Sequence, residues 1–224
     1  PRPPAGRKVL ETMLEHAKPA PALSWLNAAL ARFAADNDDL APRTRALLDV
    51  IVAEPKRHAR MINTLSLLEH MGSHKIMATQ HSAAIDQATL KHVAEEAHHA
   101  FFMKRQAEKT AERALEYVGD DLLAPSSARM YFQRLEGATV RALGEARSAR
   151  AAYLYMSMIV EFRALWFYGL YEQALKRAQH ALSLKRVLGE EQAHLGDMAE
   201  RLEAGNELDD ARAAQVLAAE RKLY

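Results

Sequence analysis

Residues 184–202 read LKRVLGEEQAHLGDMAERL, and apolar side chains recur in this segment at helical spacing. Counted from Glu191, the positions at −7, −4, −3, +4, +7 and +11 are all apolar: Leu184, Val187, Leu188, Leu195, Met198 and Leu202. The pattern predicts a helix with Glu191 in the middle of its buried face. A buried ionised carboxylate costs several kcal/mol unless it is paired or binds a metal. Glu191 is therefore a candidate functional residue.

A histidine, His194, follows Glu191 by one helical turn, and the spacing Glu-x-x-His recurs in Glu95-Glu96-Ala97-His98-His99. Residues three apart lie on the same face of a helix. Two pairings satisfy the spacing here, Glu95 with His98 and Glu96 with His99. More of the positions that share a face with Glu96 are apolar, which favours Glu96 with His99 and leaves the other pairing open.

Two further glutamates lie on apolar faces of long predicted helices. Glu69 has apolar residues at −7, −4 and +7, and Glu161 has them at −7, −3, +4 and +7. Between residues 151 and 171 the only charged side chains are Glu161 and Arg163. Glu69 precedes Glu96 by 27 residues, and Glu161 precedes Glu191 by 30. Two antiparallel helices joined by a short turn would bring both members of each pair to the same level.

The chain of 224 residues is predicted to be helical throughout, because it holds only 9 Gly and 8 Pro and is rich in strong helix formers. The predicted helices cover about 22–35, 42–52, 55–80, 83–118, 128–143, 146–176 and 181–204, with a terminal helix starting at Asp209 or Asp210. Four of them are long and form two hairpins, joined by a crossover of about 30 residues, 119–148. We expect one domain, residues 22–224, with its bundle core at about 55–204, behind a flexible leader, 1–21.

Composition excludes several kinds of protein. With 30 Lys+Arg against 29 Asp+Glu the net charge is +1, which disfavours a dedicated nucleic-acid or membrane-surface binder. The chain has no cysteine, so disulfides, thiolate zinc sites and iron–sulfur clusters are excluded. No apolar run is long enough to span a membrane, and we expect a cytoplasmic protein.

The predicted layout brings four glutamates and two histidines to one bundle centre, and this donor set suits two iron or manganese ions better than a structural zinc. The six candidate metal ligands, which are also the candidate catalytic residues, are Glu69, Glu96, His99, Glu161, Glu191 and His194. Further residues that could support them are His92, which lies one turn before Glu96, Tyr168, which shares the face of Glu161, and the alternative pair Glu95 and His98.

These residues resemble the ferritin-like di-iron carboxylate superfamily, whose motif is a Glu followed by Glu-x-x-His, given twice. The string at 95–100 is similar to the second-helix motif of rubrerythrins, although the four cysteines of their rubredoxin module are missing. The resemblance implies a ferritin-like four-helix bundle with one long crossover and additional N- and C-terminal helices. It also implies that Glu69 and Glu161 are terminal ligands and that Glu96 and Glu191 bridge two Fe ions, with Mn or a mixed Fe/Mn pair as the alternative.

The expected function is that of a di-iron oxygenase or oxidase, a monooxygenase for example, that activates O2 and oxidises an organic substrate. Electrons would come from an external donor because the chain has no cysteine. The alternatives are an iron-handling ferroxidase or peroxide scavenger, a tRNA-base hydroxylase, and a non-catalytic bundle. A homodimer or a monomer fits an oxygenase, whereas a multimeric cage fits iron storage.

Overall fold

The computed structural model describes residues 24–80, 85–144 and 148–224, and in these ranges the regular elements are all helical. The α-helices are α2 (Ser24–Asp36), α3 (Ala41–Val52), α4 (Pro55–Ala78), α5 (Gln87–Ala111), α6 (Pro125–Leu143), α7 (Ala149–Arg177), α8 (Lys185–Ala204) and α9 (Asp210–Arg221). One short 3-10 helix, η2 (Gly119–Asp121), precedes α6, and no strand occurs in the described ranges. The all-α prediction is confirmed, while the expected leader lies outside the described residues.

The chain divides into two compact units. One contains Asp49–Gln133, and therefore α4, α5 and η2. The other combines the residues up to Leu48 with Arg134–Tyr224, and therefore holds α2, α7, α8 and α9. The divisions fall inside α3 and α6. Each predicted hairpin of long helices thus lies within a single unit, and each unit is described by itself.

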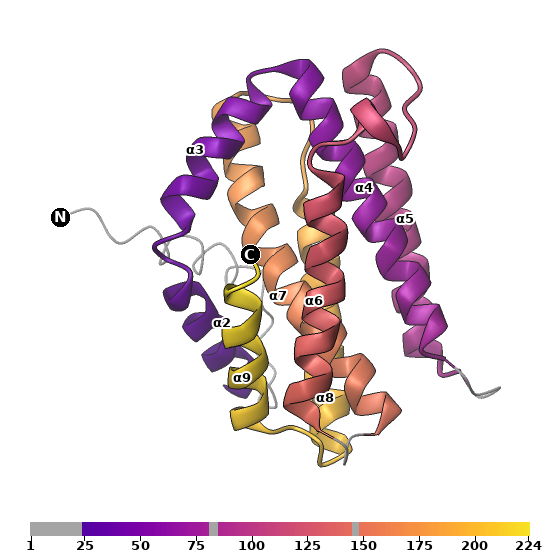
Figure 1. Ribbon diagram of the computed structural model, residues 1–224, viewed down its shortest axis with the longest axis vertical. Helices are drawn as coiled ribbons and strands as arrows, with labels where there is room; N and C mark the ends of the chain where they lie inside the picture. Colours follow the sequence, from indigo (N-terminus) through magenta and orange to yellow (C-terminus); the bar gives the residue numbers. More distant parts are fainter. Residues whose placement is uncertain (1–23, 81–84, 145–147) are drawn as a thin grey trace. The chain divides into compact units, whose positions relative to one another are not determined.

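Helices α4 and α5 pack as an antiparallel hairpin (Figure 1). The Ser66 hydroxyl on α4 donates to the Ala100 carbonyl on α5 at 2.6 Å, and Lys104 Nζ donates to the Asn63 side chain at 3.2 Å. Residues later in α5 therefore contact residues earlier in α4, as antiparallel packing requires. The helix starts follow known capping chemistry, with Pro55 in the first turn of α4 and Asp86 capping α5 through the Thr89 amide at 2.7 Å.

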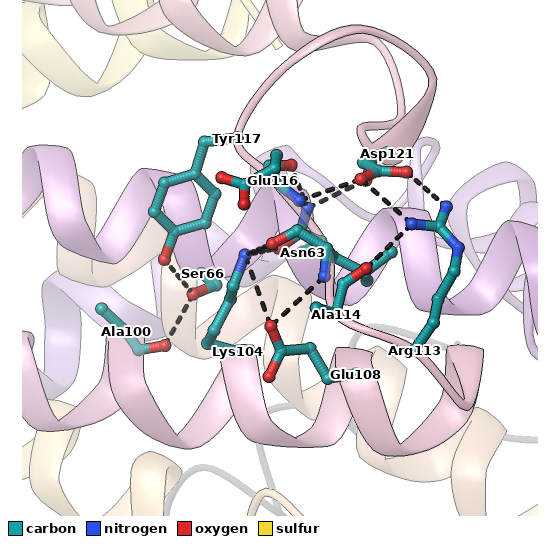
Figure 2. A network of polar contacts seen from close by, with 11 residues as sticks. Asn63, Ser66, Ala100, Lys104, Glu108, Arg113, Ala114, Glu116, Tyr117 and Asp121 are labelled. Atoms are coloured by element: carbon teal, nitrogen blue, oxygen red, sulfur yellow. Dashed lines mark hydrogen bonds and ion pairs between the residues drawn. The ribbon is translucent and has the colours of Figure 1, made fainter.

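Helix α5 ends earlier than the sequence predicted, at Ala111 rather than near residue 118. Glu112 has the left-handed φ of 55°, which stops the helix, and the chain then folds back over α4 and α5. The Asn63 amide holds this segment by donating to the carbonyls of Glu116, at 2.8 Å, and Asp121, at 3.0 Å (Figure 2). These tertiary hydrogen bonds outweigh the helix propensity of residues 112–118.

Helices α7 and α8 form the second hairpin, in the other unit. Ser148 caps α7 by accepting from the Ala151 amide at 2.9 Å. The buried carboxylate of Glu172, near the end of α7, accepts from the Leu184 amide at 2.7 Å and thereby caps α8. This cap accounts for the start of α8 at Lys185, a few residues after the predicted start.

Helix α9 is joined to α7 by a buried ion pair. Arg163 donates from Nε and from Nη2 to the two carboxylate oxygens of Glu220, both at 2.7 Å, and its Nη2 also donates to the Asn37 side chain at 2.8 Å. The guanidinium lies over the rings of Phe33, at 4.8 Å, and Tyr224, at 3.9 Å. Glu220 therefore neutralises the charge of Arg163 within the core of this unit.

Candidate metal centre

The α4–α5 hairpin places three buried ligand groups together. Glu69 of α4 and Glu96 and His99 of α5 each offer one ligand atom, and these atoms all lie within 4.8 Å of one another. Glu96 is 6% exposed and His99 is fully buried. We call these three residues the α4–α5 triad. The prediction that antiparallel packing brings Glu69 level with the Glu-x-x-His motif agrees with this arrangement.

Two residues lie next to the Glu96 carboxylate. His92 Nε2 lies 3.4 Å from Glu96 Oε1, so this imidazole can orient the carboxylate from one helical turn away. On the other side is Gly72 of α4, where an added Cβ would lie only 3.3 Å from Glu96 Oε2. The glycine therefore leaves the room that the carboxylate occupies. Sequence reasoning missed Gly72, and its one signal was a glycine inside a helical pattern.

The α7–α8 hairpin carries a matching group. His194 Nδ1 lies 3.0 Å from Glu191 Oε2 and 3.6 Å from Glu161 Oε1. All three residues are buried, and Glu191 is only 1% exposed. We call them the α7–α8 triad. As in the other unit, one Glu comes from the first helix of the hairpin, and the Glu-x-x-His pair comes from the second.

The electrostatics of the α7–α8 triad favour a cation. Burial alone lowers the pKa of His194, but the hydrogen bonds and charges of Glu161 and Glu191 outweigh it and raise the pKa to about 12. The imidazole therefore carries a proton between two carboxylates in the metal-free chain. An imidazole that binds a metal ion through this nitrogen has to release the proton.

The remaining candidates take different positions. Glu95 forms an ion pair with Lys91 at 2.7 Å, and His98 is exposed beside the ring of Phe101. Burial thus separates Glu96 and His99 from the alternative pair. Tyr168 is buried on α7, and its ring contacts that of Phe167.

The donor chemistry of the two triads fits a metal ion. Each offers two carboxylates and one imidazole, all buried, and therefore holds an excess of negative charge away from water. Buried charges of this kind are stable when paired or when they coordinate a metal. Carboxylate and imidazole donors without thiolates suit iron or manganese.

Comparison with known proteins gave no match: no protein-family model, no curated protein and no solved structure matches this chain. Within the described ranges, no helix has the length and apolar character that crossing a membrane requires.

Proposed function

We propose that the two triads combine in one Glu4His2 centre that holds two iron ions, in a ferritin-like four-helix bundle made of α4, α5, α7 and α8. The observation that carries this proposal is the repeated arrangement: each hairpin presents one Glu opposite a Glu-x-x-His pair, buried in both cases. A single buried Glu–His contact is common in helical proteins. The same three-residue group in two hairpins of one chain is what the proposal rests on.

The proposed activity is that of an oxygenase or oxidase acting on an organic substrate. The carboxylates and imidazoles of the two triads would hold the two irons, which would supply the electrons for reducing O2, with an external donor as the source of replacement electrons. As the resemblance implies, Glu69 and Glu161 would hold the ions as terminal ligands, and Glu96 and Glu191 would be the shared ligands. Among the chain's other residues, His92 orients Glu96, and Gly72 leaves space for its carboxylate.

Metal content tests the proposal directly. Protein produced with iron is analysed for iron per chain, and its Mössbauer spectrum is recorded to determine whether the irons are magnetically coupled. We expect about two coupled irons, because bridging carboxylates hold the ions close together. Uncoupled irons would refute the combination of the two triads in one centre.

Isosteric variants test the ligand assignment. Glu96→Gln and Glu191→Gln should each lose one or both irons, because an amide is a much poorer ligand than a carboxylate. The control is Glu95→Gln, which removes the ion pair with the exposed Lys91 from the same motif. Full iron occupancy in both Glu96→Gln and Glu191→Gln would contradict the proposal.

Product analysis separates the oxidising enzyme from iron handling. Oxygen uptake by the iron-loaded chain with a reductant is compared with and without added organic substrates of several classes. An oxidised organic product supports the oxygenase or oxidase. Accumulation of ferric iron beyond two ions per chain, without an organic product, would favour the iron-handling alternative.

A further inference from the structure

A pair of histidines lies outside both triads. His70 and His74 are both exposed on α4, and they are four residues apart, so their side chains leave the same face of the helix. Their ring centroids are 4.5 Å apart, with an interplanar angle of 67°. Two imidazoles at i and i+4 on a helix can chelate one metal ion.

The ring separation fits two neighbouring ligands of one ion when a nitrogen of each ring faces that ion. With a metal–nitrogen bond of about 2.1 Å, each imidazole centroid lies roughly 3.2 Å from a bound ion. When a nitrogen of each ring faces the ion, centroids 4.5 Å apart correspond to a nitrogen–metal–nitrogen angle of about 90°. Tetrahedral zinc would place the centroids roughly 5.2 Å apart. An angle near 90° is that of neighbouring ligands in octahedral or square-planar Ni²⁺ and Cu²⁺ complexes.

One of the two imidazoles is held in place by the segment that follows α5. Tyr117 stacks on His70, with a centroid distance of 5.9 Å and an interplanar angle of 26°. Tyr117 is itself fixed, since its hydroxyl lies 2.7 Å from the Ser66 hydroxyl and Lys104 Nζ lies 4.3 Å from its ring centroid (Figure 2). Less side-chain freedom is then lost when a metal binds, and this preorganisation distinguishes the pair from an ordinary surface histidine pair.

We propose that His70 and His74 form a surface site for a divalent late transition-metal ion, Ni²⁺ or Cu²⁺, separate from the buried carboxylate triads. Two imidazoles supply neighbouring ligands, and water supplies the others. The chain has no cysteine, so no thiolate competes for these ions. The proposal does not depend on the function proposed for the triads.

Calorimetric titration of the metal-free full chain with Ni²⁺ tests the site. We expect His74→Ala to bind about one equivalent less than the unaltered chain. The matched control is His98→Ala, which removes an exposed histidine from α5. Alanine is the best helix former, so both variants should keep the fold, which circular dichroism verifies. The proposal is overturned if His74→Ala titrates like the unaltered chain, or if both variants lose the same amount of Ni²⁺.

Two variants of Tyr117 test the preorganisation. Tyr117→Phe keeps the ring but removes its hydroxyl contact with Ser66, so it should weaken Ni²⁺ binding less than Tyr117→Leu does. Tyr117→Leu removes the ring and should weaken binding roughly two- to tenfold, the cost of ordering one side chain. Equal affinities in the two variants would contradict the role of the stacked ring.

Discussion

Gly72→Ala places a methyl group 3.3 Å from Glu96 Oε2, so it should stabilise the chain less than an ordinary glycine-to-alanine substitution in a helix and should weaken metal binding. An alanine in place of glycine inside a helix stabilises by about 1 kcal/mol. At position 72, however, the new Cβ lies 3.3 Å from Glu96 Oε2, which is shorter than an ordinary van der Waals contact. Moving the Glu96 side chain off its rotamer costs about 0.5–1.5 kcal/mol, so the two effects nearly cancel.

The control for this substitution is Gly189→Ala. Gly189 is an exposed glycine of α8, and an added Cβ there would have no atom within 4 Å. This variant should gain the full helix contribution of about 1 kcal/mol. For a chain of this size, that corresponds to a rise in Tm of roughly 2–4 °C. Gly72→Ala should show little or no rise.

Iron binding provides the second measurement on the same two variants. If Glu96 is a ligand, displacing its carboxylate should weaken iron affinity by roughly 10–100-fold, as changes beside a metal ligand do. Gly189→Ala should bind iron as the unaltered chain does. The reasoning is refuted if both variants are stabilised equally and keep the same iron affinity, because the Glu96 carboxylate would then not depend on the space at Gly72.

Three further predictions concern the scaffold. Glu220→Gln should lower the free energy of unfolding by about 3–5 kcal/mol, since it weakens a buried ion pair, and the double variant Arg163→Met/Glu220→Leu should recover most of that loss in urea titrations. The hydrogen bond from Arg113 lowers the pKa of Asp121 from 3.8 to about 2, so its contribution is present above pH 3.8 and is lost as the pH falls toward 2. The stability gap between the unaltered chain and Asp121→Asn should therefore close over that range in acid titrations. Tyr117→Phe should cost about 0.5–1.5 kcal/mol, one hydrogen bond, in the same urea assay, and an unchanged midpoint would contradict the contact with Ser66.

The sequence predicted those parts of the fold that depend on the residue pattern within a single helix. Apolar periodicity located the long helices. Helix-start signals located the start of α4 at Pro55 and the start of the short terminal helix α9 near Asp210. Burial of Glu96 and Glu191 followed from the residues on the same helix face. These features depend on neighbours within about two helical turns, which is the range that a periodicity argument covers.

The parts that sequence did not predict depend on distant residues. Helix α5 stops at Ala111 because Asn63, about 50 residues earlier, binds the backbone of the segment that follows. Helix α8 starts at Lys185 because the Glu172 side chain of α7 caps it. The space at Gly72 became visible only when the opposing helix was in place. A single sequence contains the residues in each case but not their pairing.

Glu161 and Arg163 show why burial of a charge does not by itself identify a metal site. They are the two charged residues of one apolar segment. Side chains two positions apart in an α-helix point to nearly opposite sides of it. Arg163 donates to both oxygens of a single carboxylate, that of Glu220, so the two charges neutralise each other. Glu161 meets a histidine that a second carboxylate, Glu191, also contacts. Two carboxylates share one imidazole, and the excess of negative charge favours the binding of a cation. The balance of charge within each cluster therefore distinguishes a structural ion pair from a candidate metal centre.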